Sequence, residues 1–572
     1  MKNKKIFKIL SILMVVIFVA ISINLSSFAS IKKGESDTSS ITITGLEADV
    51  SVYIYQLTTV NYDYESDGPY DPEYVWVEGI QNWITSNYPN NINDDGSVSE
   101  DFNVEDVTTA TGFYSELISA IRSGSLLSAT DSISGTENTE TVTVELSDDE
   151  ETKSVTFTGL EMGTYLIVTE NGLRVYTPVV VNLVPEYDDD EDSETYGEWV
   201  LNAKEVDCKS TSLTITKTVY DDETTSEVTQ VNYSTADTLN YTIITDVPTY
   251  ESNSISYTYK ITDSLDEGLT LDEDSIRVYG IDSDTTDDLT THSSETEEIT
   301  NSDGNYYTLT YTYDDDNNIT GYTLEFSYSE IADYEQIKVT YDAELNQDSS
   351  LVISDEENVD TEDSHILGNE NTATLIYSND PYESNSVEEI SAEVVVYTYG
   401  IDITKISEDL DDDGNKVYLA GAEFELQDSD ENALYFVLVD GVYYLAESTD
   451  DNATTTLVTA SGGKLYIYGL DEGTYYLQET KAPEDYILDT KAQTIVIKDS
   501  DPNGLLDVED ETTETGYSDS ADGIYYMEVE NITGFSLPLT GGVGSILFVL
   551  AGVVLIIIGI FIDKKKNKKE IN

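Results

Sequence analysis

The chain has 572 residues, with 26 Lys and Arg against 114 Asp and Glu and a formal net charge of −88. Nucleic acid is excluded as a partner, because binding to phosphates needs a cationic surface. Disorder is excluded as well, since hydrophobic residues make up 39% of the chain and 43 residues are tyrosines. The length predicts about three domains.

The residues that usually carry catalysis are scarce. The two histidines, His292 and His365, lie far apart in the sequence, and Cys208 is the only cysteine. This set indicates neither a zinc site nor a nucleophilic triad, and one cysteine excludes a disulfide framework. We therefore expect a protein that is not an enzyme and that needs no cofactor.

The N-terminus is typical of a secretory signal peptide. A lysine-rich start precedes the apolar run 9–25, and Ser27-Phe28-Ala29 has small residues on both sides of one spacer. A basic region, an apolar region and a small-residue cleavage site define this kind of export signal. We assign residues 1–29 to the signal peptide; the alternative is a permanent membrane anchor.

Apolar and polar residues alternate along most of the mature chain, for example at 306–312 and 322–328. These two segments flank a turn rich in Asp and Asn and predict a hairpin. Strands rich in tyrosine and β-branched residues, separated by polar turns, predict a mainly β protein of tandem immunoglobulin-like β-sandwiches. Short helices are expected near 79–86 and 113–122.

Two similar strands, 213–219 and 401–406, suggest that a new domain opens after residue 210 and again after residue 398. The expected order is an N-terminal domain at 30–210, a middle β-sandwich at 211–398 and a third β-sandwich at 399–535.

Lysine is rare in the mature chain, so two lysines inside these opening strands stand out. Lys217 shares the parity of the apolar residues of 213–219, and Lys405 shares that of Ile401 and Ile403. In an extended strand this parity places each lysine on the apolar face. The alternative is a lysine at a strand edge whose amine reaches water.

The C-terminal end carries three signals in order. Leu537-Pro538-Leu539-Thr540-Gly541 is followed by the apolar run 543–562 and by a lysine-rich tail. The run is long enough for a transmembrane helix, and the lysines favour a cytoplasmic tail. This order, at 536–572, resembles the Gram-positive cell-wall sorting signal. The resemblance implies that sortase attacks Thr540, releases Gly541 and joins the protein to an amine, for instance of peptidoglycan.

The third domain resembles the Cna-B-type domains of Gram-positive pilins. Residues 475–486 resemble the E-box of that family, and 525–531 form a closing strand before the sorting signal. The resemblance implies an isopeptide bond between Lys405 and Asn531, promoted by Glu479. Burial would lower the lysine pKa and raise the glutamate pKa, giving a nucleophilic amine and an acid that polarises the amide.

The middle domain resembles the other isopeptide-forming sandwich type of the same family, through 215–219, 259–269 and 371–381. The resemblance implies Lys217 as the nucleophile. We expect Asn371 as its partner, with Asn379 as the alternative. We expect Asp263 as the acid, with Asp246 as the alternative.

The N-terminal domain departs from this pattern. Its segment 159–165 is similar to 469–475, but Thr169 stands where Glu479 stands in the third domain, and Glu170 comes one residue late. A shift of one residue moves a side chain to the opposite face of a strand. The opening strand 41–44 also has no lysine, so we expect no isopeptide bond here.

A polymerising pilin needs one accessible lysine. Residues 196–199 followed by 206–210 resemble the pilin motif, although Asp207-Cys208 replaces its Tyr-Pro and Ser210 replaces its Asn. Lys209 is therefore the expected linkage lysine, with Lys204 as the alternative. An ordinary linker lysine is the third possibility.

An acidic segment, residues 409–415, starts like a calcium-binding loop, but its twelfth position is Ala420 instead of an acid. An acidic hairpin turn is the favoured interpretation, and we assign no metal site.

The leading hypothesis is a sortase-assembled backbone pilin, displayed as a peptidoglycan-anchored surface pilus. Its expected partners are sortase, other copies of the chain in a covalent head-to-tail polymer, and peptidoglycan. The alternative is a monomeric wall-anchored adhesin whose N-terminal domain holds a host surface ligand. A surface hydrolase would need a cleft with paired acids, which the sequence does not indicate.

Overall fold

A computed structural model describes residues 38–47, 50–63, 68–100, 102, 112–122, 126, 131–133, 142–146, 151–221, 225–235, 237–250, 254–282, 297–301, 304–315, 317–349, 368–383, 386–500, 503–507, 516–518 and 523–534. The signal peptide at 1–29 and the sorting pentapeptide 537–541 lie outside these residues.

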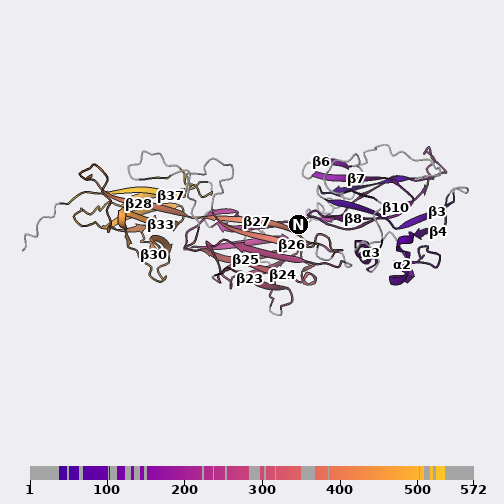
Figure 1. The fold of residues 1–572 in the computed structure, drawn as a ribbon, viewed down its shortest axis with the longest axis horizontal. Coiled ribbons are helices and arrows are strands. Elements are labelled where there is room, and N and C mark those ends of the chain that lie inside the picture. Colours follow the sequence, from indigo (N-terminus) through magenta and orange to yellow (C-terminus); the bar gives the residue numbers. More distant parts are fainter. Residues whose placement is uncertain are drawn as a thin grey trace, which may run out of the picture.

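The molecule is elongated, with three groups of sheets in a row (Figure 1). The N-terminal sheets and two helices lie at the right of the view, the middle sheets follow, and the third group lies at the left. The described chain is mainly strands, as the alternating pattern predicts. The prediction of tandem β-sandwiches is therefore confirmed.

The N-terminal domain has two four-stranded sheets among its described residues. The strands of the first sheet, in spatial order, are β13 (Lys204–Asp207), β1 (Ser39–Leu46), β7 (Glu151–Leu160) and β6 (Val142–Leu146). Those of the second are β10 (Val179–Leu183), β8 (Gly163–Glu170), β2 (Ser51–Gln56) and β5 (Asp131–Ile133). Short pairs join β3 (Thr58–Asp63) to β4 (Gly68–Trp76), β11 (Glu186–Tyr187) to β12 (Trp199–Val200), and β9 (Val175–Tyr176) to β14 (Ser210–Thr211).

Two helices cover the outer face of the second sheet. They are α2 (Glu78–Asn87), followed by the 3₁₀ turn η1 (Pro89–Asn91), and α3 (Phe113–Arg122), which confirms both predicted helices. Their apolar side chains pack with Leu166 and Val168 of β8. Tyr165 and Ile167 of the same strand pack into the sandwich on the other side. Strand β8 is therefore apolar on both faces instead of alternating.

The middle domain packs two larger sheets over one core. The first contains β16 (Ser226–Val228), β15 (Ile215–Asp221), β18 (Thr238–Asp246), β25 (Gln336–Leu345), β21 (Arg277–Ile281) and β22 (Glu297–Glu298), with β20 (Leu269–Leu271) also on β25. The second contains β17 (Gln230–Asn232), β27 (Glu388–Tyr397), β26 (Asn369–Tyr377), β19 (Tyr259–Leu265), β24 (Ile319–Phe326) and β23 (Tyr307–Tyr313). Strands β23 and β24 form the predicted hairpin, and the short helix α4 (Tyr328–Ile331) follows β24.

The third domain has a six-stranded and a four-stranded sheet. The first contains β30 (Tyr435–Val439), β31 (Val442–Ala446), β33 (Lys464–Leu470), β28 (Tyr399–Ser407), β37 (Ile524–Asn531) and β36 (Gly516–Ser518). The second contains β32 (Leu457–Val458), β29 (Glu423–Gln427), β34 (Gly473–Lys481) and β35 (Gln493–Ile497), and the 3₁₀ turn η2 (Ser461–Gly463) precedes β33. The opening strand β28 and the closing strand β37 lie side by side in parallel.

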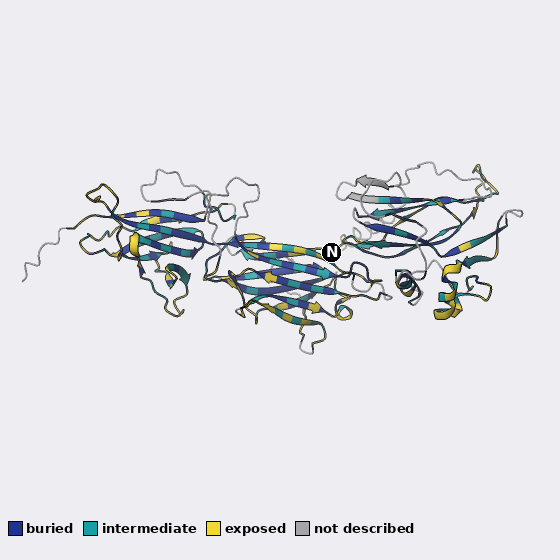
Figure 2. Ribbon diagram, viewed as in Figure 1, coloured by how far each residue is buried: buried dark blue, intermediate teal, exposed yellow. Residues whose placement is uncertain are grey.

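Buried and partly exposed residues alternate along the strands (Figure 2). In β26 the alternate residues from Asn369 to Tyr377 are buried, so each sandwich presents one face of each sheet to its core. The buried set nevertheless includes Lys217, Asp263 and Asn371 in the middle domain. Buried charged and amide groups need hydrogen-bond or ion-pair partners in an apolar core, so we expect these three side chains to contact one another or other polar groups.

An ion pair joins the first domain to the second, and a backbone hydrogen bond joins the second to the third. Arg122 of α3 forms an ion pair with Asp380, which follows β26 of the middle domain. At the second joint, the Thr235 backbone N–H donates to the Gly469 carbonyl at 3.0 Å. Gly469 has φ of +79°, and a Cβ there would lie 2.4 Å from the Thr235 hydroxyl, so this close approach requires glycine.

The transmembrane prediction is corrected. No helix in the described part of the chain is long and apolar enough to cross a membrane. The apolar run 543–562 lies outside the described residues, and its hydropathy alone had suggested the span. We therefore do not keep the transmembrane assignment.

Candidate cross-linking sites

In the third domain, three buried side chains meet below the joined first and last strands. Lys405 lies on β28 opposite Val529 of β37, and Asn531 lies two residues further along β37. Glu479 comes from β34 in the opposite sheet. Lys405, Glu479 and Asn531 are 0%, 3% and 1% exposed, so the site is closed to solvent.

The glutamate faces both nitrogen atoms of this site. Its Oε1 lies 3.2 Å from Lys405 Nζ, and its Oε2 accepts a hydrogen bond from Asn531 Nδ2 at 3.1 Å. The Asp489 backbone N–H also donates to Oε2, at 2.8 Å, and fixes the carboxylate in place. The Asn531 amide donates further to the Ile487 carbonyl at 3.0 Å. Asn531 Nδ2 is thereby held on the glutamate.

Burial makes the third-domain lysine easier to deprotonate. It lowers the pKa of Lys405, although the nearby Glu479 charge opposes the shift. The Phe424 ring lies 5.4 Å from Nζ and supplies part of the apolar wall. Asn531 Oδ1 has no hydrogen-bond partner among the described residues. A buried polar atom without a partner costs about 1–3 kcal/mol, so the unlinked asparagine is held at a free-energy disadvantage.

The middle domain brings a second lysine, acid and asparagine together. Lys217 comes from β15 in one sheet, whereas Asp263 on β19 and Asn371 on β26 are on adjacent strands of the other sheet. Lys217 Nζ donates to Asp263 Oδ2 and to Asn371 Oδ1, both at 2.5 Å. All three side chains are buried. The nucleophile and the amide are therefore in direct contact across the core.

Burial shifts both ionisable groups of this second site toward their neutral forms. Burial lowers the pKa of Lys217 to about 8, against the opposing attraction of the Asp263 carboxylate. Burial likewise raises the pKa of Asp263, and Lys217 opposes that shift. The rings of Tyr241 and Tyr341 lie 5.4 Å and 5.7 Å from Nζ. Both shifts lower the free-energy cost of moving a proton from the amine to the carboxylate, because desolvation disfavours both charges.

The alternative residues of the middle domain lie elsewhere. Asn379 donates to the Gly172 carbonyl at 3.1 Å and so belongs to the joint with the N-terminal domain. Asp246 accepts hydrogen bonds from Thr214 and Gln336 near the surface. Neither contacts Lys217 among the described residues.

The N-terminal domain uses the corresponding positions differently. Glu170, at the end of β8, pairs with Arg122 at 3.3 Å, and the Thr169 carbonyl accepts from the same guanidinium at 3.2 Å. Its strands β1 and β13 pair in parallel, as β28 and β37 do in the third domain. Cys208 follows β13 and is buried in the apolar core, where desolvation raises its thiol pKa to about 12. This thiol is therefore an apolar packing group.

Of the two linkage candidates, Lys209 is exposed, whereas Lys204 is partly buried. The backbone of Lys209 is fixed, because its carbonyl accepts from the Thr177 N–H at 3.0 Å. Lys204 Nζ instead lies 2.5 Å from Glu186.

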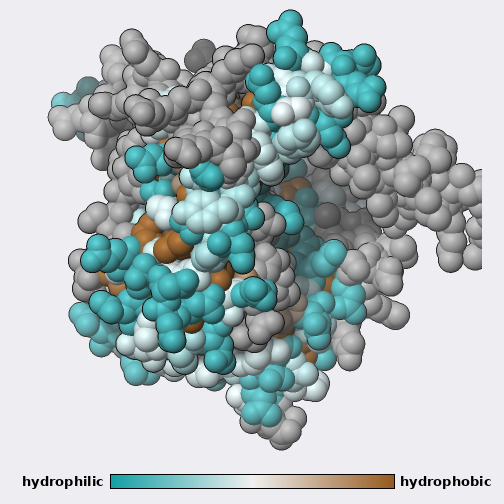
Figure 3. Space-filling view, turned by 90° about the vertical axis from the view of Figure 1, so that its right-hand side faces the viewer, coloured by the Kyte–Doolittle hydropathy of each residue, from teal (hydrophilic) through white to brown (hydrophobic). Residues whose placement is uncertain are grey.

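The end of the molecule formed by the N-terminal domain is mostly hydrophilic, with separate apolar patches (Figure 3).

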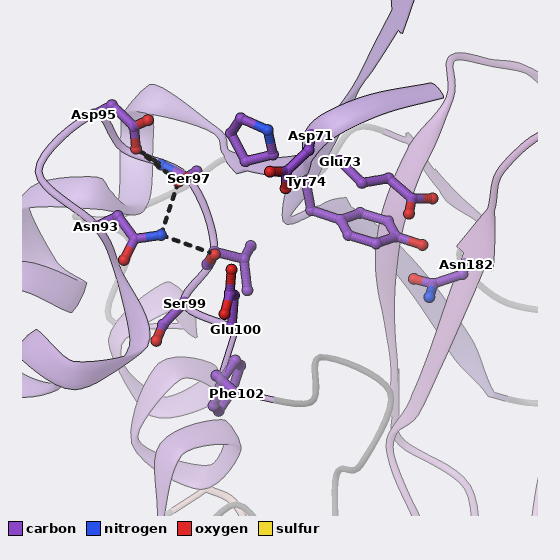
Figure 4. Close-up of a pocket in the computed structure, with 12 residues that line it drawn as sticks. Asp71, Glu73, Tyr74, Asn93, Asp95, Ser97, Ser99, Glu100, Phe102 and Asn182 are labelled. Carbon is purple, nitrogen blue, oxygen red and sulfur yellow. Dashed lines mark hydrogen bonds between the residues drawn. The ribbon is translucent and has the colours of Figure 1, made fainter. Parts of the chain in front are cut away.

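A pocket of about 560 Å³ opens in the N-terminal domain between the β3–β4 hairpin and the segment after η1 (Figure 4). Tyr74, Phe102 and Asn182 line it together with several carboxylates. Within it, Ser97 donates to Asp95 at 2.6 Å and Asn93 donates to Ser97 at 2.9 Å. The pocket is polar with a small aromatic wall.

The acidic segment 409–415 forms a hydrogen-bonded turn. The Asp411 carboxylate accepts from the backbone of Asp413 at 3.0 Å and from that of Asn415 at 2.7 Å. No cluster of three or more His, Cys, Asp or Glu side chains able to hold a metal occurs among the described residues.

The sequence did not single out Tyr341, which contacts both Asp263 and Asn371. Its hydroxyl donates to Asp263 Oδ1 at 3.1 Å and accepts from Asn371 Nδ2 at 2.7 Å. Tyrosine is too abundant here for one member to be distinguished without the sheet pairing. Strand alignment could have supplied the signal, because Tyr341 pairs with Tyr241, and Tyr241 pairs with Val219, two residues after Lys217.

Comparisons with known proteins agree with this architecture. Residues 402–512 match the SpaA family model, described as a prealbumin-like fold domain, and residues 530–572 match the LPXTG cell wall anchor motif. The trypsin-resistant surface T6 protein of Streptococcus pyogenes serotype M6 is 24% identical over 350 residues, which cover 56% of this chain. The chain matches 53% of the length of that relative.

The solved structure of the T6 backbone pilin of serotype M6 S. pyogenes, a modular three-domain protein, has a TM-score of 0.55. Its identity is 16%, and the match covers 88% of this chain and 99% of that one. The full-length major pilin SpaD of Corynebacterium diphtheriae has 18% identity, a TM-score of 0.45 and coverage of 88% and 99%.

The anchor motif and the tandem sandwiches define a cell-wall-anchored surface protein. Within that class, residues 402–512 match a SpaA-type domain, and the similarity to the T6 protein supports the expectation of a backbone pilin.

Proposed function

We propose that this chain is the shaft subunit of a surface pilus, polymerised and wall-anchored by sortase and stabilised by two autocatalytic Lys–Asn isopeptide bonds. The pilin relatives and the anchor motif support a structural role in a pilus. The observation that carries the cross-links is the buried lysine–acid–asparagine group in both the middle and the third domain.

The proposed chemistry exchanges one amide for another. The neutral Lys405 amine attacks Cγ of Asn531, the Asn531 Cγ–Nδ2 bond breaks, and ammonia leaves. Glu479 accepts a proton from Nζ at one carboxyl oxygen and supplies one to Nδ2 from the other, so it is unchanged at the end. The second bond forms in the same way, with Lys217 as the nucleophile, Asp263 as the acid and Asn371 as the amide. Each bond removes a buried amine that would otherwise need a counter-charge.

The two bonds would replace disulfides, which a chain with one cysteine cannot form. In the third domain the bond ties β28 to β37, the first and last strands. Force applied through the two ends of this domain would act on the covalent link instead of on hydrogen bonds between strands. The same amide resists reduction, unlike a disulfide.

Intact mass of the mature protein tests this proposal. We expect a mass lower than that of the sequence by two ammonia molecules. A mass equal to that of the unmodified chain would rule out both bonds. Loss of only one ammonia would show that one of the two bonds forms, and peptide mapping would then identify which one.

Sortase processing is proposed at the Thr540–Gly541 bond, with peptidoglycan or a second subunit as the acceptor. Deleting 537–541 should abolish wall attachment, measured by cell-wall fractionation. A deletion variant that remained covalently bound to the wall would contradict the assignment.

Lys209 is the proposed acceptor on the next subunit, because its side chain is exposed. In cells with the cognate sortase, Lys209→Ala should remove the ladder of covalent multimers from a denaturing gel. Lys204→Ala is the matched control, since it removes a neighbouring lysine that is paired with Glu186. Loss of the ladder in the control alone would reassign the acceptor to Lys204. An intact ladder in both variants would exclude both lysines as the acceptor.

The second candidate is a monomeric wall-anchored adhesin that holds a host surface ligand in its N-terminal domain. The pocket lined by Tyr74, Phe102 and Asn182 favours it. This candidate predicts a wild-type protein without covalent multimers when the cognate sortase is present. It also predicts that Tyr74→Ala lowers cell adhesion while leaving wall attachment intact.

A further inference from the structure

We propose that Tyr341 is a catalytic residue of the middle-domain reaction and relays a proton between Asp263 and the departing nitrogen of Asn371. The inference rests on the proposed Lys217–Asn371 bond and adds a group that the lysine–acid–asparagine scheme does not contain. It assigns different proton paths to the two cross-linking sites.

The tyrosine hydroxyl lies between the acid and the leaving group. It donates to Asp263 Oδ1 at 3.1 Å, and Asn371 Nδ2 donates to it at 2.7 Å. The other carboxyl oxygen, Oδ2, contacts Lys217 Nζ at 2.5 Å. These contacts form an unbroken path from Nζ through both carboxyl oxygens and the hydroxyl to Nδ2.

Side-chain length explains why the middle domain needs this additional group. In the third domain, Glu479 contacts the lysine with one oxygen and the asparagine nitrogen directly with the other. Asp263 is one methylene shorter, and among the described residues it makes no hydrogen bond to Asn371. Tyr341 reaches in from β25 of the opposite sheet and spans the gap.

The surroundings hold the tyrosine ready for proton transfer. Its side chain is buried and stacks on Tyr241, with ring centroids 5.1 Å apart and planes inclined by 15°. Burial raises the pKa of Tyr341 well above its usual value, so the hydroxyl keeps its proton. A protonated hydroxyl that can accept on one side and donate on the other passes a proton without itself becoming charged.

The step balances as follows. Lys217 first gives one proton to Asp263 Oδ2, the oxygen that it contacts, which leaves a neutral amine and a neutral acid. A half-turn of the neutral carboxyl group about its Cβ–Cγ bond then brings the protonated oxygen to Tyr341. Nζ attacks Cγ of Asn371 and becomes a cation, while the carbonyl oxygen becomes an anion. The unprotonated oxygen of Asp263, which now faces Lys217, takes a proton from Nζ, the protonated oxygen gives its proton to Tyr341, and Tyr341 gives its own to Nδ2. The Cγ–Nδ2 bond then breaks, the carbonyl re-forms and ammonia leaves.

Both hydrogen bonds of Tyr341 must reverse during this step: the acid must donate to the hydroxyl, and the hydroxyl must donate to Asn371. In the planar amide the Nδ2 lone pair is delocalised into the carbonyl, so Nδ2 only donates. When Cγ becomes tetrahedral, the lone pair localises on Nδ2 and can accept a proton. The hydroxyl at 2.7 Å is already at the distance that this reversal requires.

The test is a time course of bond formation in the full mature chain made by cell-free synthesis, followed by peptide mass mapping. Tyr341→Phe should slow the Lys217–Asn371 bond by about 10²-fold or more, the range for loss of general acid–base catalysis. The Lys405–Asn531 bond should form at the wild-type rate in the same molecules.

Tyr322→Phe is the matched control. Tyr322 is also buried and packs edge-on against Tyr341 at 5.4 Å, but its hydroxyl has no hydrogen-bond partner among the described residues. This variant should form both bonds at the wild-type rate. An equally slow middle-domain bond in both variants would show that packing, and not proton relay, is responsible.

A second variant keeps the test decisive if Tyr341→Phe weakens the fold. Adding Asp263→Glu to Tyr341→Phe gives a longer acid that can contact the Asn371 nitrogen directly. The double variant should therefore form the bond at least tenfold faster than Tyr341→Phe. Wild-type speed in Tyr341→Phe, or no gain in the double variant, would overturn the relay. No bond in the wild type would instead reject the proposed Lys217–Asn371 cross-link itself.

Discussion

The middle and third domains place the same three chemical groups on different parts of a sandwich. In the third domain, Lys405 and Asn531 lie on neighbouring strands of one sheet, and Glu479 reaches them from the other sheet. In the middle domain, Lys217 faces Asn371 across the core, and the acid lies beside the asparagine. The third-domain bond would therefore join two strands, whereas the middle-domain bond would join two sheets.

The comparison indicates that the position of the acid decides whether the site needs a further proton-transferring group. Glu479 lies opposite both nitrogens and has one carboxyl oxygen for each. Asp263 shares a sheet with Asn371 and uses one oxygen for Lys217, while the other faces Tyr341. A longer acid approaching from the opposite sheet and a shorter acid with a tyrosine are two solutions to one proton-transfer problem.

Removing each acid should give the largest effect and keep the two domains independent. Glu479→Ala should prevent only the third-domain bond, and Asp263→Ala only the middle-domain bond. Each variant leaves a buried lysine without its carboxylate, which costs about 3–5 kcal/mol in addition to the lost cross-link. Domain-resolved thermal unfolding and peptide mass mapping measure both effects. Loss of both bonds in either variant would show that the sites are coupled.

The pH dependence of an unlinked middle domain should give the next largest effect. Asn371→Ala prevents the bond and keeps Lys217 buried. The Lys217 pKa is lowered from 10.5 to about 8, so the unfolded chain binds more protons between these values. Stability should therefore rise as the pH increases from 8 to 10.5, by about 3 kcal/mol for a shift of this size.

Denaturant unfolding at pH 8 and pH 10.5 measures this change. The linked wild-type protein is the control, because its Lys217 nitrogen is an amide and no longer titrates. Equal pH dependence in the two proteins would mean that Lys217 is not desolvated in the folded variant.

A surface ion pair should give the smallest effect. Lys416 and Glu528 are 2.5 Å apart, as Lys217 and Asp263 are, but both are about half exposed. Lys416→Ala should leave the free energy of unfolding nearly unchanged, because solvent screens such pairs. A change as large as that of Asp263→Ala, measured by denaturant unfolding, would show that burial does not distinguish the two pairs.

Strand parity was sufficient to locate the lysines. Lys217 and Lys405 share the face of their apolar neighbours, and both are buried in the structure. For Asn531, the prediction came from the resemblance of the third domain to pilin domains and not from strand parity. The choice between Asn371 and Asn379 needed the pairing of β19 with β26, which places Asn371 beside Asp263 and Asn379 at a domain joint.

Contacts made across sheets or between domains could not be read from local pattern. Tyr341 is one of 43 tyrosines, and only the packing of β25 over β19 and β26 gives it a distinct place. Arg122 ends a predicted helix, but its partner Asp380 is more than two hundred residues away. Such partners depend on how the sheets close, which periodicity does not specify.

The central claim is that this chain cross-links itself twice, and peptide mass mapping of the wild-type mature protein tests it most directly. The account predicts two branched peptides, one joining Lys217 to Asn371 and one joining Lys405 to Asn531. Each should be one ammonia lighter than its two linear parts. Recovery of all four residues in linear, unmodified peptides from the folded protein would contradict the account.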